Sequence, residues 1–209
     1  MAHRIVTRSR FVVALTLGAA TALSALPAFA APSPGSLPQT TLEPSFGTPL
    51  TKQMTTLASA IAHHSVAMGN KVFFPEAAYV RMKTGEIPSP AGDWRSRLFS
   101  FFVLDLGAYR DRLFATHHTT FVRVEANPRY AQWIPPGVCE NKIGYWHEPN
   151  VRLVFRHNTT LESVLVASLI SWRGVWYVVH LGPNPRADNV GTVDGYQLGA
   201  GAPGPGGGC

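Results

Sequence analysis

The feature that most constrains this chain is a pair of apolar segments joined by a two-residue turn. Residues 164–172 and 175–181 flank Arg173-Gly174, a pattern that predicts a β-hairpin. The predicted register pairs Trp172 with Val175, Ile170 with Tyr177, and Ala167 with His180. Both faces of this hairpin carry large apolar side chains, so we expect a sheet that is covered on both sides or curls around an interior.

Helical patterns come before this hairpin, and strand patterns lead into it. Apolar spacing predicts helices over 51–69, 75–82 and 93–114, the last with a broad apolar face. Alternation predicts short strands over 119–125, 130–134, 142–147 and 151–156. Helices followed by a meander of strands indicate an α+β fold, with helices packed on a curled antiparallel sheet.

The first thirty residues have the three parts of a secretory signal peptide. Three arginines precede an apolar run, and the triplet Ala28-Phe29-Ala30 ends it. We expect cleavage after Ala30 and a secreted, extracellular or cell-envelope location, with an uncleaved N-terminal anchor as the alternative. After cleavage no segment is long and apolar enough to span a membrane.

Removal of this leader halves the formal net charge, because it holds three of the 18 Lys and Arg and none of the 12 Asp and Glu. The charge falls from +6 to +3, and the remaining cations are scattered, so we expect no nucleic-acid partner. Residues 31–50 are rich in proline without a hydrophobic period, which predicts a linker. We therefore expect one domain over 51–182, followed by a loop and a flexible Gly/Pro-rich tail over 183–209.

The chain has two cysteines, Cys139 and Cys209. In an oxidising compartment we expect them to form a disulfide that ties the C-terminal tail to the domain. An intermolecular disulfide and a free terminal thiol are the alternatives.

The order of elements and the closing hairpin, Ser168 to His180 with its two tryptophans, resemble the NTF2-like superfamily. The resemblance covers residues 51–182 by pattern and implies a cone-shaped α+β fold whose helices and sheet enclose a pocket. The whole chain also resembles exported actinobacterial proteins of unknown function, which supports the location and gives no chemistry.

The resemblance makes polar residues in apolar contexts the candidates for a pocket. His180 and Asp105 are the candidate catalytic pair, because a buried neutral histidine beside a carboxylate can act as a general base. The candidate ligand-binding residues are Tyr109, Tyr145, His147, Arg152 and Tyr177. The alternatives are a structural histidine at a strand edge for His180 and aromatic core packing for the Tyr145–His147 segment.

Three functional hypotheses remain. Motifs for a serine esterase, a zinc protease, a P-loop and a C-x-x-C centre are missing, and we expect no metal and no cofactor. This favours a secreted, non-catalytic domain that binds a small apolar ligand or an envelope protein. The alternatives are a small isomerase or hydrolase that uses the Asp105–His180 pair, and a purely structural interaction domain with a filled cone.

Overall fold

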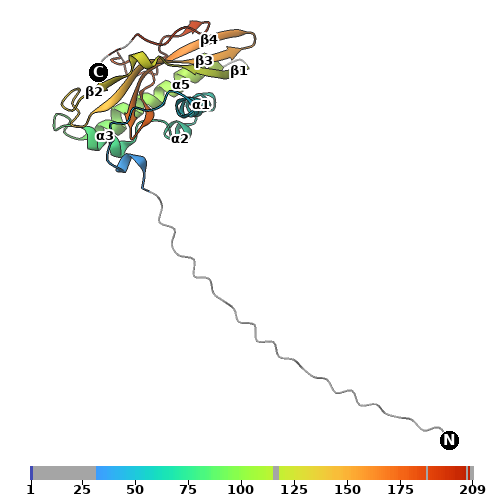
Figure 1. The fold of residues 1–209 in the computed structure, drawn as a ribbon. Helices are drawn as coiled ribbons and strands as arrows, with labels where there is room; N and C mark the ends of the chain where they lie inside the picture. Colours follow the sequence, from blue (N-terminus) through green and yellow to red (C-terminus); the bar gives the residue numbers. More distant parts are fainter. Residues whose placement is uncertain (2–31, 115–117, 187, 206, 208–209) are drawn as a thin grey trace. The chain divides into compact units, whose positions relative to one another are not determined.

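The predicted hairpin lies inside a six-stranded antiparallel sheet. The computed structural model describes residues 1, 32–114, 118–186, 188–205 and 207, so the predicted signal peptide lies outside the described residues. The main strands lie in the order β1 (Thr119–Glu125), β3 (Tyr145–His157), β4 (Thr160–Trp172) and β5 (Val175–His180). The short strands β2 (Gln132–Ile134) and β6 (Gln197–Leu198) pair with β3 and β4. This arrangement confirms the α+β class (Figure 1).

The turn between β4 and β5 forms as predicted. Arg173 and Gly174 have φ values of 53° and 75°, the left-handed conformations that a tight two-residue hairpin requires. The end of the register is also confirmed, with Trp172 opposite Val175. Further along, the prediction that Ala167 lies opposite His180 is wrong.

The register changes because β5 has one extra residue, Val179, between His180 and Val178, the partners of Ser168 and Leu169. As a result Ser168, not Ala167, lies opposite His180. A bulge of this kind leaves one residue outside the regular ladder and redirects the neighbouring side chains. Ser168 and His180 both line the pocket described below.

The predicted strands over 142–147 and 151–156 are one long strand, β3. The sequence interrupts the alternation at Pro149 and Asn150, and Asn150 has a φ of 54°. The strand nevertheless continues through this point, since Pro149 still lies opposite Ser168 of β4. A local irregularity in a strand was therefore mistaken for a break between two strands.

The helices precede the sheet. They are η1 (Pro34–Ser36), α1 (Thr48–Ala62), α2 (Val66–Gly69), α3 (Glu76–Met82), α4 (Pro90–Asp93), η2 (Trp94–Phe99) and α5 (Ser100–Phe114), and η3 (Pro128–Tyr130) follows β1. The helix predicted over 51–69 is two helices, because the chain turns at His64, whose φ is 48°. The helix predicted over 93–114 begins at Pro90 and contains a π-helical turn, η2.

Both faces of the hairpin are buried, as its apolar pattern predicted. Trp172 and Trp176 are 0% and 2% exposed. The Trp172 ring contacts Phe74, and the Trp176 ring contacts Phe46, which precedes α1. Helices α1 and α5 also contact each other and β5 (Figure 1). The hairpin is therefore covered by segments from the N-terminal half of the chain.

The segment predicted as a Pro-rich linker packs against the hairpin instead. Residues 32–209 form one compact unit. The Trp172 indole Nε1 donates to the Pro34 carbonyl at 2.9 Å, and the Gln39 amide donates to the Ser171 carbonyl at 2.8 Å. The Trp146 indole donates to the Thr41 carbonyl at 3.0 Å. Side-chain to backbone hydrogen bonds therefore fix this extended segment without any hydrophobic period.

Candidate functional site

A pocket of about 640 Å³ lies between α3, η2 and the central strands of the sheet. Helix α3 and η2 supply one wall, strands β3, β4 and β5 supply the opposite one, and loop residues 139–141 and 183–185 extend the sides. This volume is in the range of about 300–1,000 Å³ that is usual for small-molecule sites. The pocket is therefore the strongest candidate for a functional site in the described part of the chain.

Two histidines face the pocket from neighbouring strands, as the sequence predicted for both. His147 of β3 is 5% exposed, and its Nε2 is 2.8 Å from the hydroxyl of Ser168. Its Nδ1 is buried near the backbone of Gly207 without a hydrogen bond of good geometry. Burial lowers the pKa of His147 to about 4, because the surroundings disfavour the imidazolium.

His180 of β5 lines the same pocket beside Ser168. Burial lowers its pKa to about 4, and the nearby Arg97, Arg186, His147 and Lys83 lower it further. These pKa values leave both histidines neutral at pH 7.

A second polar group lies where α3 meets the loop at residues 139–141. Lys83 directly follows α3 and is 11% exposed. Its ammonium is 3.7 Å from a Glu140 carboxylate oxygen and 3.4 Å from the Cys139 carbonyl, both long contacts. Burial lowers the pKa of Lys83, an effect that Glu140 only partly offsets.

Asn141 and Tyr145 continue this group along the pocket wall. Asn141 is 4% exposed, and its Nδ2 donates to the Tyr145 hydroxyl at 3.4 Å. The Asn141 Oδ1 has no hydrogen-bond partner in the described ranges. Burial raises the pKa of Tyr145 to about 12, so its hydroxyl stays protonated and able to donate.

Arg97, in contrast, is held firmly by protein groups. Its Nε and one terminal nitrogen donate to the two Asp93 oxygens at 2.7 and 2.6 Å, and the same terminal nitrogen donates to the Tyr79 hydroxyl at 3.2 Å. The Tyr79 hydroxyl in turn donates to Asp93. The guanidinium hydrogen bond holds the pKa of Asp93 below its usual range. This cluster joins α3 to η2 and fixes one wall of the pocket.

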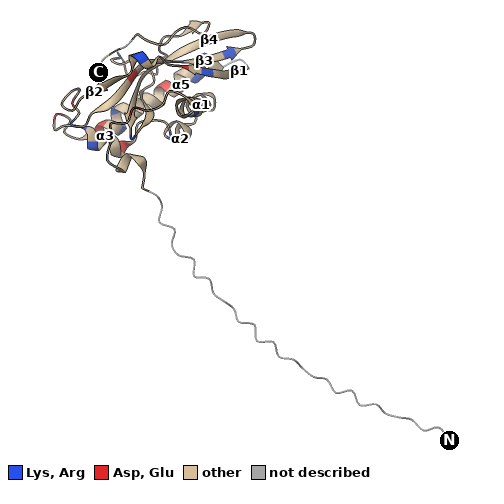
Figure 2. Cartoon of the chain, in the orientation of Figure 1, with Lys and Arg blue, Asp and Glu red and all other residues tan. Residues whose placement is uncertain are grey.

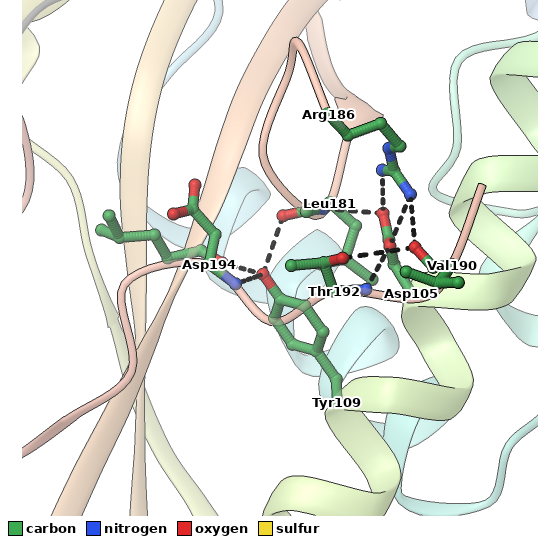
Figure 3. A network of polar contacts seen from close by, with 9 residues as sticks. Asp105, Tyr109, Leu181, Arg186, Val190, Thr192 and Asp194 are labelled. Carbon is green, nitrogen blue, oxygen red and sulfur yellow. Dashed lines mark hydrogen bonds and ion pairs between the residues drawn. The ribbon is translucent and has the colours of Figure 1, made fainter. Parts of the chain in front are cut away.

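The structure does not assemble the predicted Asp105–His180 pair. Asp105 is 1% exposed and does not line the pocket. Its carboxylate forms a two-contact ion pair with Arg186 at 3.0 and 2.7 Å, and it accepts the backbone N–H groups of Gly182 and Thr192 at 2.9 and 3.0 Å (Figure 3). Every acceptor position of Asp105 is thus occupied by groups that fix the segment after β5. Its position on the apolar face of α5 predicted a buried partner, and an arginine supplies it.

Tyr109 is also structural. Its hydroxyl contacts the carbonyl oxygens of Leu165 and Leu181 at 2.7 and 2.8 Å and accepts the Asp194 N–H at 3.0 Å (Figure 3). It joins α5, β4 and the C-terminal segment, away from the pocket lining.

The remaining predicted ligand-binding residues also divide into those that line the pocket and those that have structural contacts elsewhere. Tyr145 lines the pocket, whereas Tyr177 and Arg152 do not. Tyr177 is 6% exposed and packs edge-on against Phe74. Arg152 donates to the carbonyls of Gly195 and Ala202, at 3.0 and 2.9 Å, and to Ser163. The segment predicted as a flexible tail is therefore held to the sheet over its described residues.

The pocket residues absent from the sequence-based candidates include Lys83, Arg97, Asn141 and Ser168. Lys83 and Arg97 are common residue types at the ends of helical patterns, which gives no signal by itself. Ser168 was part of the predicted hairpin, but its pairing with His180 depends on the extra residue in β5. Asn141 comes from a loop without periodicity.

Cys139 lines the pocket near Glu140, and Gly207 lines it too. Cys209 lies outside the described residues, so the Cys139–Cys209 disulfide stays a prediction. The position of Gly207, two residues before Cys209, brings the end of the described chain to the same pocket as Cys139.

Charged groups are distributed over the helices and strands, with blue and red positions intermixed (Figure 2). Among the described residues there is no cluster of three or more His, Cys, Asp or Glu side chains suited to a metal ion. The helices of this part of the chain are also too short or too polar to cross a membrane.

Comparison with known proteins gave no match to a family model, to a curated protein or to a solved structure.

Proposed function

We propose that this protein is an exported, non-catalytic domain that binds a small, partly apolar molecule in the pocket between α3, η2 and strands β3–β5. The observation that carries the proposal is the pocket itself together with a residue of its lining, Asn141, whose buried Oδ1 has no hydrogen-bond partner among the described residues. A buried polar atom without a hydrogen bond costs about 1–3 kcal/mol, so native proteins rarely leave one unpaired. A bound molecule that hydrogen-bonds to it removes that cost.

The concave shape favours a small molecule over a protein partner. A protein interface of ordinary strength buries about 800 Å² on each side and is mostly flat. Here the polar atoms lie inside a pocket whose apolar walls include Met82, Leu98, Ile170 and Val179. An envelope protein remains a weaker candidate than a small ligand.

Export and the cone-shaped fold belong to the same proposal. The N-terminal leader supports a secreted or envelope location. An antiparallel sheet preceded by helices, with a pocket between them, supports an NTF2-like arrangement. A small ligand from the cell envelope is consistent with both.

A second candidate function is acyl transfer from an ester to water. The observation that favours it is the 2.8 Å contact between His147 Nε2 and the Ser168 hydroxyl. Ser168 Oγ would attack the ester carbonyl while His147 accepts its proton and returns it to the leaving alcohol, and water would then release the acid. A histidine whose pKa is about 4 is a weak base for this step, so binding ranks first. Hydrolysis of p-nitrophenyl butyrate that disappears in Ser168→Ala would reverse this order.

Native mass spectrometry of the exported protein tests the binding proposal. We expect a bound small molecule that Ala167→Phe displaces, because Ala167 lines the pocket and a phenyl ring would occupy it. Ala77→Phe is the matched control, since Ala77 is exposed on α3. A pocket that holds no adduct, together with a crystal structure in which side chains fill it, would support the purely structural alternative and overturn the proposal.

A further inference from the structure

We infer that the molecule bound in this pocket is an organic anion with an apolar body, and that Lys83 is the group that receives its charge. This inference rests on the proposed binding function and adds the chemical class of the ligand. It starts from the incomplete pairing of Lys83.

The Lys83 side chain is 11% exposed, and its ammonium has only long contacts with acceptors among the described residues. Charge-assisted hydrogen bonds from nitrogen to a charged oxygen are normally about 2.7–2.9 Å long. The two contacts of Lys83 are 3.7 Å, to Glu140, and 3.4 Å, to the Cys139 carbonyl. Glu140 is 51% exposed, so water screens much of its attraction for the ammonium. A ligand carboxylate or sulfonate at hydrogen-bonding distance would complete the shell of Lys83.

The neighbours of Lys83 are also donors. Asn141 Nδ2 reaches the Tyr145 hydroxyl only at 3.4 Å. Because Tyr145 accepts from Asn141, its own proton is directed elsewhere, and no protein acceptor for it is found in the described ranges. An ammonium, an amide N–H and a phenol O–H on one wall are complementary to an anionic group with several lone pairs.

The other charges around the pocket agree with this reading. The cations that act on His180 are Arg97, Arg186 and Lys83. Of the carboxylates, Asp93 is neutralised by Arg97, and Asp105 by Arg186.

Two further carboxylates line the pocket, Glu140 and Asp194. Glu140 is the loose partner of Lys83, and burial raises the pKa of Asp194 while the nearby Arg152 lowers it. Each carboxylate near the pocket therefore has a cationic neighbour in the described part of the chain. Lys83 differs from Arg97 and Arg186 because its ammonium meets its partner carboxylate at longer range.

A pair of fluorescent dyes tests the inference on the mature protein. Anilinonaphthalene sulfonate and N-phenylnaphthylamine share one ring system, and only the first carries a negative charge. We expect the wild-type protein to prefer the sulfonate. Lys83→Met should weaken the sulfonate about tenfold or more and leave the neutral dye unchanged, whereas Lys83→Arg should retain most of the preference.

Lys142→Met is the matched control, because Lys142 is exposed and does not line the pocket. It should leave both affinities unchanged, and a thermal melt of each variant confirms folding. If Lys83→Met folds and lowers both affinities equally, or neither, the anion inference is wrong while the pocket remains a binding site. If neither dye binds the wild-type protein, or Ala167→Phe leaves both affinities unchanged, the proposed function fails as well.

Discussion

Replacement of Asp105 by alanine should destabilise this protein more than any surface substitution on the same helix. Asp105 and Arg186 are 1% and 7% exposed, and their charges meet at 2.7 Å. Asp105→Ala leaves the guanidinium buried without its counter-ion and removes the acceptor of two backbone N–H groups, those of Gly182 and Thr192. Removal of one partner of a buried ion pair costs about 3–5 kcal/mol.

Thermal and urea denaturation, followed by tryptophan fluorescence, measure this cost. For a domain of this size the loss corresponds to a fall in Tm of roughly 6–20 °C. Asp111→Ala is the control, since Asp111 lies on the same helix, is 75% exposed and pairs with Arg110 at 3.5 Å. The control should change the free energy of unfolding by less than about 1 kcal/mol.

A double variant separates the ion pair from its surroundings. Asp105→Ala combined with Arg186→Met removes both charges, so it should be more stable than the sum of the single variants predicts. If Asp105→Ala costs no more than Asp111→Ala, the carboxylate does not hold the segment after β5, and the description of Figure 3 as a structural network is wrong.

Three further predictions concern buried titratable groups and the cysteines. Glu148 is 0% exposed, and burial raises its pKa to about 7, so the stability that its protonated form contributes is complete below the pKa of the unfolded chain and is lost as pH rises through 7. Glu148→Gln should therefore be more stable than the wild-type protein at pH 9 but not at pH 5. Equal urea midpoints for the variant and the wild-type protein at both pH values would contradict this. The pKa of His147 is lowered to about 4, so the stability that the neutral imidazole contributes is present above about pH 6.5 and is lost as pH falls toward 4. The free energy of unfolding of His147→Gln should therefore depend less on pH over that range. A pH dependence equal to that of the wild-type protein would rule out a buried neutral His147. The intact mass of the exported protein, alkylated with and without reductant, should show two protected thiols in a monomer, and a free Cys209 or a reducible dimer would exclude the Cys139–Cys209 bridge.

The sequence predicted those parts of the fold in which apolar residues recur at a regular spacing. The two-residue turn at Arg173-Gly174 and the stripe that contains Leu106 and Leu113 were both found, because burial on one side imposes a regular spacing. The bulge at Val179 of β5 was missed, since no residue type requires it, and it shifted the partner of His180 by one position.

The packing of the N-terminal segment was missed for a different reason. Residues 32–47 are fixed by single hydrogen bonds from Gln39 and Trp172 to distant backbone carbonyls. Such contacts leave no pattern along the chain. A proline-rich segment that is held in this way has the same composition as a free linker.

The site was predicted in part. His147, His180 and Tyr145 were singled out as polar residues within apolar strands, and all three line the pocket. The same criterion also selected Asp105 and Tyr109, which hydrogen-bond to the C-terminal segment. It cannot separate the two cases, because a polar residue on an apolar face is buried whether its partner is a ligand or another part of the protein.

A crystal structure of the mature protein with anilinonaphthalene sulfonate tests the central claim most directly. We predict that the dye occupies the pocket, with its rings between Leu98 and Val179 and its sulfonate within hydrogen-bonding distance of the Lys83 ammonium. Dye bound only elsewhere, or a pocket filled by the protein's own side chains, would contradict the claim that this pocket is a binding site for organic anions.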